Sequence, residues 1–130
     1  RWQATSSTGL TLFGDSVRGR LKDGGDLPRI PADRLGARID QRLTAGFSAQ
    51  LEATQEMRQD HTADYETETG DYTLLGAGLN WRGQLGESDV LLYLRGNNLL
   101  NEKARQHSSF IKDEVLLPGR NLTVGARLVF

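Results

Sequence analysis

The 130-residue sequence lacks cysteine, has only three prolines and carries no excess of either charge. The absence of cysteine excludes disulfides, thiolate metal sites and cysteine nucleophiles. No run approaches about 18 consecutive apolar residues, which excludes a transmembrane helix. Sixteen Lys and Arg residues balance 17 Asp and Glu residues to a net charge of −1. Because nucleic-acid-binding domains usually carry a basic excess, we expect no nucleic-acid partner.

The composition fits a water-soluble core poorly. Glycine is frequent, with 15 residues, while hydrophobic residues make up 37% and charged residues 25% of the chain. A membrane β-strand remains compatible with the mean hydropathy of −0.50, because its polar and apolar residues alternate. The first residues, Arg1 to Thr5, contain no basic segment followed by an apolar one. We therefore expect no signal peptide in this chain.

Apolar and polar residues alternate in six segments, and the last ten residues show this most clearly. Leu122, Val124, Leu128 and Phe130 share a phase that Arg127 does not. Because successive strand side chains point to opposite faces, this alternation predicts strands with one apolar and one polar face. The predicted strands lie near residues 10–21, 34–43, 47–58, 72–82, 89–97 and 121–130, with Trp2 to Thr5 as the tail of a seventh. Windows of about ten residues match a tilted membrane strand.

The two faces have different predicted environments. The face predicted to contact lipid, or to form an aromatic girdle at the membrane boundary, carries Phe47, Leu79, Trp81, Leu92, Leu122, Val124, Leu128 and Phe130. The opposite face, predicted to line a lumen or contact a plug, carries Arg34, Arg38, Asp40, Arg42, Glu52, Arg95 and Arg127. The same alternation would also suit a soluble barrel with the apolar face inside.

Short and long connections alternate along the chain. Residues 44–46 and 83–88 are short connections, whereas residues 22–33, 59–71 and 98–120 are long and polar. Outer-membrane barrels have tight periplasmic turns and longer extracellular loops. We therefore predict an all-β fold: six to seven strands of the antiparallel up-and-down wall of a larger transmembrane β-barrel.

Several segments resemble TonB-dependent outer-membrane receptors. The stretch Asp26-Leu27-Pro28-Arg29-Ile30-Pro31, followed by Arg34-Leu35-Gly36, is similar to the approach to a late barrel strand of that family. The run from Leu94 to Glu102 is similar to the penultimate strand and its exit. The segments Ala104 to Phe110 and Leu117 to Asn121, and the terminal strand ending in Phe130, extend the resemblance over residues 10–130.

The resemblance implies energised uptake of a scarce nutrient across the bacterial outer membrane. Zinc-uptake receptors are among the similar subfamilies, so a metal or metal chelate is the expected nutrient. Such receptors are plugged barrels of about 22 strands. The implied partners are outer-membrane lipid, the rest of the barrel with its plug, TonB through an N-terminal part, and the barrel-assembly machinery through Phe130. The sequence contains no TonB box and no plug domain, so we expect a carboxy-terminal segment of such a receptor.

The candidates for chemistry are few. His61 lies in an acidic loop from Asp60 to Glu68, and imidazole with carboxylates can bind zinc. His107 would join His61 only if their two loops converged, so we assign no metal and expect no cofactor. Asp40 and Glu52, with Arg38 and Arg42 nearby, are better explained as an ion network than as a catalytic pair. We expect no enzymatic activity.

A soluble antiparallel β-sheet binding module, lipocalin-like or a sandwich, is the alternative. It would bind a small ligand or a protein. In such a module the apolar side chains must be buried against one another, whereas in a receptor wall they form an exposed band about 25 Å tall.

Overall fold

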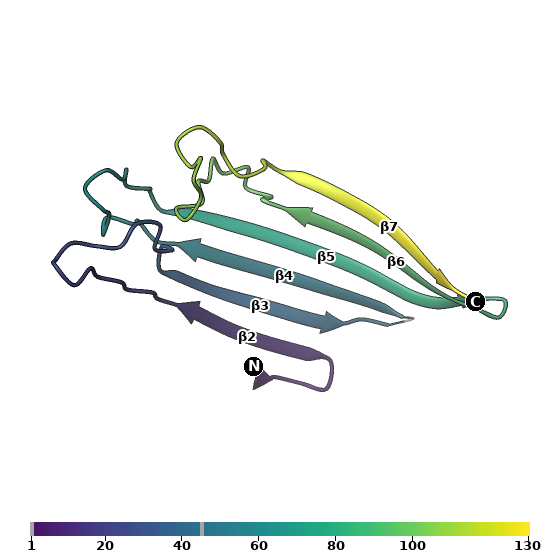
Figure 1. Cartoon of the computed structure of the whole chain (residues 1–130). Coiled ribbons are helices and arrows are strands. Elements are labelled where there is room, and N and C mark those ends of the chain that lie inside the picture. Colours follow the sequence, from purple (N-terminus) through teal and green to yellow (C-terminus); the bar gives the residue numbers. More distant parts are fainter. Residues whose placement is uncertain (1, 45) are drawn as a thin grey trace.

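The computed structural model describes residues 2–44 and 46–130. Within these residues seven strands follow one another, and β2 to β7 are labelled in Figure 1. Their bounds are β1 Trp2–Gln3, β2 Thr8–Asp15, β3 Arg34–Arg42, β4 Phe47–Glu56, β5 Tyr72–Leu85, β6 Ser88–Asn97 and β7 Asn121–Val129.

The strands form one antiparallel sheet in which every strand pairs with its neighbour in sequence. The order is β1-β2-β3-β4-β5-β6-β7, and it confirms the prediction of an all-β, up-and-down antiparallel sheet. In the described part of the chain the sheet is open, with β1 and β7 as its edges. The sheet is a single curved layer, with the long loops at one end and the short turns at the other (Figure 1).

The strand bounds differ most from the sequence prediction at two places. The strand predicted near residues 10–21 ends at Asp15, and the following residues form a loop that folds back on itself through a bridge between Arg20 and Asp26. In contrast, β5 continues past Trp81 to Leu85, so the hairpin turn between β5 and β6 is shorter than predicted. Gly83 interrupts the apolar alternation there without ending the strand.

The sheet has little buried interior of its own. The buried hydrophobic residues of the described chain, Ala63 and Ala104, both lie in long loops. A single layer leaves both of its faces open unless another element covers them. Among residues 2–44 and 46–130, no helix is long and apolar enough to cross a membrane.

Candidate functional site

The strand register places most apolar side chains of the seven strands on one face. One row runs straight across the sheet through Trp2, Leu10, Ile39, Leu51, Ala77, Gly96 and Leu122. We call the face that contains this row the apolar face. By the same register it also carries Leu12, Leu35, Leu79, Trp81, Leu92, Leu94, Val124 and Leu128. The predicted phases are therefore continuous from strand to strand.

Most of these apolar side chains are exposed. Val124 is 78%, Leu122 70% and Leu12 69% accessible, and Leu92 and Leu128 are also exposed. An apolar patch that spans every strand of a sheet far exceeds the scattered single residues usual on protein surfaces. This face therefore requires an apolar environment.

Aromatic residues lie on this face toward the short-turn end. Phe47 begins β4 and pairs in register with Trp81 of β5, their ring centroids being 6.4 Å apart. Trp81 does not end its strand as predicted, because the β5–β6 hairpin extends four residues beyond it. Phe130 follows β7 directly at the same end and is fully exposed.

The opposite face is polar and carries the predicted charged residues. Arg34 forms an ion pair with Asp15 on β2, at 2.7 Å. Arg38 lies 3.3 Å from Asp40 on its own strand and 3.9 Å from Glu52, its register partner on β4. Both carboxylates therefore contact one guanidinium. This arrangement supports the ion-network interpretation of Asp40 and Glu52.

The remaining predicted arginines of the polar face have other neighbours. Arg42, the last residue of β3, hydrogen-bonds the Ser6 carbonyl in the β1–β2 turn. The Arg95 guanidinium lies 5.9 Å from the centroid of the Tyr93 ring. Arg127 is the register partner of Leu91 and shares this face.

Glycines open a shallow hollow on the polar face. Gly76 and Gly78 lie on its floor, and its volume is about 190 Å³, with Glu52, Asn80 and Arg95 among its lining residues. A methyl group added at Gly76 would meet no atom closer than 3.5 Å. These glycines therefore leave room on this face.

The three long loops converge at their end of the sheet. They comprise residues 16–33, 57–71 and 98–120, and lie side by side in Figure 1. The Gln59 amide of the middle loop donates to the carbonyls of Ile30 and Pro31 in the first, at 3.1 and 3.0 Å. Thr67 of the middle loop donates to Asp113 of the last, at 2.6 Å.

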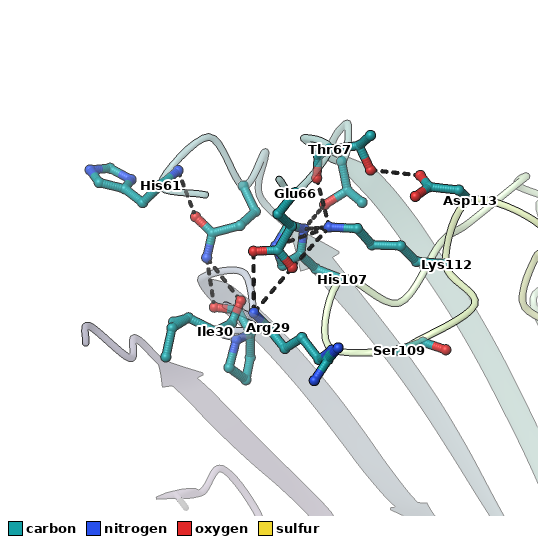
Figure 2. A network of polar contacts seen from close by, with 12 residues as sticks. Arg29, Ile30, His61, Glu66, Thr67, His107, Ser109, Lys112 and Asp113 are labelled. Carbon is teal, nitrogen blue, oxygen red and sulfur yellow. Dashed lines mark hydrogen bonds and ion pairs between the residues drawn. The ribbon is translucent and has the colours of Figure 1, made fainter. Parts of the chain in front are cut away.

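The two histidines have different surroundings. His61 is exposed and its Nδ1 lies 3.0 Å from the carboxylate of its neighbour Asp60. His107 is buried between the middle and last loops, with Nδ1 2.8 Å from Thr69 Oγ1 and Nε2 3.3 Å from Glu66 Oε1. Figure 2 shows His61 pointing away from the cluster around His107. The loops converge, but they do not bring these two rings into one cluster.

No group of three or more His, Asp or Glu side chains is arranged to hold a metal ion in the described ranges 2–44 and 46–130. At His107 a cation would also meet the Lys112 ammonium, 3.4 Å from both ring nitrogens. A neighbouring positive charge disfavours cation binding there.

Sequence reasoning did not identify Glu66, Thr69 or Lys112 as important residues. In the sequence Glu66 is one of several acidic residues of a polar loop, and Lys112 lies 46 residues away. The signal available was the sparse apolar content of the middle loop, residues 57–71, which is compatible with either a solvated or a polar-clustered structure. No protein-family model matches the chain.

Proposed function

We propose that this chain forms the carboxy-terminal part of the membrane wall of an outer-membrane receptor of the TonB-dependent kind. The observation that carries the proposal is the exposed apolar face spanning all seven strands, opposite a charged face. A lipid bilayer supplies the apolar environment that such a face requires, and a strand can cross it with its backbone groups paired.

The distribution of loops and rings supports the same proposal. The three long loops emerge at one end of the sheet and the tight turns at the other (Figure 1). Outer-membrane barrels sort their connections in this way, with long loops outside the cell. Phe47 and Trp81 lie near the tight turns on the apolar face, where a membrane boundary favours aromatic side chains.

The open sheet edges also fit a segment of a larger wall. The outer edges of β1 and β7 have no neighbouring strand in the described residues. In a membrane such edges must be paired, because unsatisfied backbone groups are costly in hydrocarbon. The remaining barrel strands would pair them, and a plug or water would meet the polar face.

The proposed activity is energised uptake of a scarce nutrient, a metal or a metal chelate, as the sequence resemblance implies. TonB would deliver energy through an N-terminal part of the receptor, and the barrel-assembly machinery would read the terminal strand with Phe130. The soluble lipocalin-like or sandwich alternative is less well supported, because it requires Leu92, Leu122 and Val124 to be buried, and all three are exposed.

The size and location of the native polypeptide test the proposal. Fractionated source cells would be blotted with serum raised against the loop peptide of residues 59–71. We expect a band several-fold heavier than 14.4 kDa in the outer-membrane fraction. A band of 14.4 kDa in the soluble fraction would contradict the proposal.

A further inference from the structure

One carboxylate joins the three long loops. Glu66, in the middle loop, accepts a hydrogen bond from the Lys112 ammonium of the last loop, at 3.1 Å. Its two oxygens also lie 3.1 and 3.2 Å from the backbone nitrogen of Arg29 in the first loop, which donates to them. His107 of the last loop places Nε2 3.3 Å from the same carboxylate. Figure 2 shows these groups pointing toward one another from three separate segments.

The cluster is shielded from water. The side chains of His107, Lys112 and Glu66 are 2%, 6% and 7% accessible. Buried charges are stable only when they are paired and hydrogen-bonded. Here Lys112 also donates to the Thr67 carbonyl at 2.6 Å, and Thr69 Oγ1 bonds His107 Nδ1. The buried polar groups of the middle and last loops therefore form one hydrogen-bonded network.

The charges balance only while His107 is neutral. Glu66 carries one negative charge and Lys112 one positive charge. A proton on His107 would add a second positive charge 3.4 Å from the Lys112 ammonium, with one carboxylate between them. Burial and Lys112 both lower the pKa of His107, while Glu66 opposes them. The ring is therefore neutral at pH 7 and resists protonation more than a free imidazole does.

Other charged or titratable groups also face the ring. From its own loop, Arg105 donates to the Lys112 and Asp113 carbonyls, and the Asp113 carboxylate raises the pKa of His107 as a weaker influence. From the strand ends, a cavity of about 330 Å³ that His107 lines is also lined by Asp15, Arg34, Glu56 and Tyr72. Asp15 and Arg34 pair with each other at 2.7 Å. The groups nearest the ring nitrogens remain Thr69, Glu66 and Lys112.

We propose that Glu66, His107 and Lys112 form an acid-sensitive clasp, which holds the three long loops together at neutral pH and releases them when His107 is protonated. The inference rests on the loop contacts alone and holds whether or not the sheet lies in a membrane. A group whose pKa is lowered by folding stabilises the structure above its unfolded pKa, about 6.5 for histidine. That contribution is lost as the pH falls through the lowered value.

The contribution of Glu66 to stability is likewise lost on acidification. Burial by itself would raise the pKa of Glu66, but Lys112, the Arg29 backbone and His107 together hold it below its ordinary value. Its contribution is therefore present above the ordinary carboxyl pKa and is lost below it. Protonation of either group therefore weakens the contacts, and a variant without the His107 ring separates the two contributions.

Distances between loops measure the clasp directly. The protein, in its full-length form, would carry spin labels at Asp64 and Glu114, exposed positions in the middle and last loops. We expect a narrow distance distribution at pH 7.5 and a broad one at pH 5.0. Each unit by which folding lowers the pKa of His107 corresponds to a roughly tenfold change in the open-to-closed ratio. A label pair at Thr44 and Glu87, in short turns at the opposite end, controls for the sheet.

Two variants assign the transition. In His107→Gln no ring titrates, so we expect the distribution at pH 5.0 to match that at pH 7.5. In Lys112→Met a protonated His107 can pair with Glu66 without a rival cation, so we expect the loops to stay closed at pH 5.0. An unchanged wild-type distribution would overturn the proposal. So would a wild-type transition retained in both variants, or one that also appears in the control pair.

Discussion

At the scale of single residues, two adjacent leucines report on the two faces of the sheet. Leu92 lies on the apolar face, in register with Trp81 and Ala126, whereas Leu91 lies on the polar face beside Arg82 and Arg127. The two positions share a residue type, a strand and almost the same depth. Substitutions at these two positions therefore differ mainly in the face of the sheet on which the new side chain lies.

We predict that Leu92→Arg impairs insertion and that Leu91→Arg is tolerated. An arginine facing lipid costs up to about 2–4 kcal/mol at the bilayer midplane and less near the boundary. On the polar face the new guanidinium faces water or a plug instead. Repulsion from its register partners Arg82 and Arg127 costs roughly 0.2–1 kcal/mol per pair, which is less than the cost in lipid. The measurement is the amount of folded protein in the outer-membrane fraction, corrected for expression. Equal loss for both variants would contradict the assignment of faces.

Aromatic rings on the polar face have a structural explanation at the same scale. Phe13 is out of phase with the apolar residues Leu10 and Leu12 of its strand. Its ring covers Gly36 on the paired strand β3, where an added methyl group would lie 2.2 Å from a ring carbon. Tyr93 covers Gly125 on β7 in the same way. These rings fill the space that the glycines leave, so the apparent irregularity is a cross-strand packing pair.

At the scale of elements, β2 ends at Asp15, and an ion pair closes the loop that follows it. Arg18 forms two hydrogen bonds with Asp33, at 2.7 and 2.6 Å, which close the loop between β2 and β3. Hydrogen bonds from Arg18 and Ser16 lower the pKa of Asp33 to about 2. The alternation in residues 16–21 predicted a longer strand. A pattern within one strand cannot reveal an ion pair between residues that lie 15 positions apart.

The β3–β4 and β5–β6 hairpin turns each contain a glycine with positive φ, but the two glycines differ in the space around them. Gly46 has a φ of 82°, and an added Cβ would lie 2.1 Å from the Arg82 carbonyl oxygen. Gly86 has a φ of 62° and open space around it. Left-handed backbone costs a residue with a side chain roughly 1–2 kcal/mol.

We therefore predict that Gly46→Ala destabilises the protein more than Gly86→Ala. Gly86→Ala carries the conformational cost alone, about 1 kcal/mol. Gly46→Ala adds a clash with backbone, which cannot move aside as a side-chain end can. Urea unfolding of the two variants, compared with wild type, measures the difference. Equal shifts in the midpoint would show that the Arg82 contact is not limiting.

At the scale of the whole molecule, the sequence predicted the sheet better than the loops. Strand number, antiparallel order and the residues on each face follow from an alternation that each strand carries locally. The loop cluster depends on pairs such as Glu66 and Lys112, which lie 46 residues apart. Their approach is set by the strand order and loop lengths together. Residue types alone pointed to His61, which the structure leaves exposed beside Asp60.

The molecule therefore has three regions with different chemistry. One face of the sheet is apolar and exposed, the other is polar with internal ion pairs, and the long loops hold the most buried polar side chains. A water-soluble protein of this size normally places apolar side chains in its interior. Here the apolar side chains of the sheet are exposed instead, which is the central reason for proposing a membrane location.

The most direct test of that placement is an accessibility scan along β7, from Asn121 to Val129, in the reconstituted full-length protein. Single spin labels would be compared for collisions with oxygen, which concentrates in lipid, and with a water-soluble nickel chelate. We predict high oxygen accessibility at positions 122, 124, 126 and 128, and relatively higher nickel accessibility at positions 121, 123, 125 and 127. Absence of a two-residue period, or the opposite phase, would contradict the account.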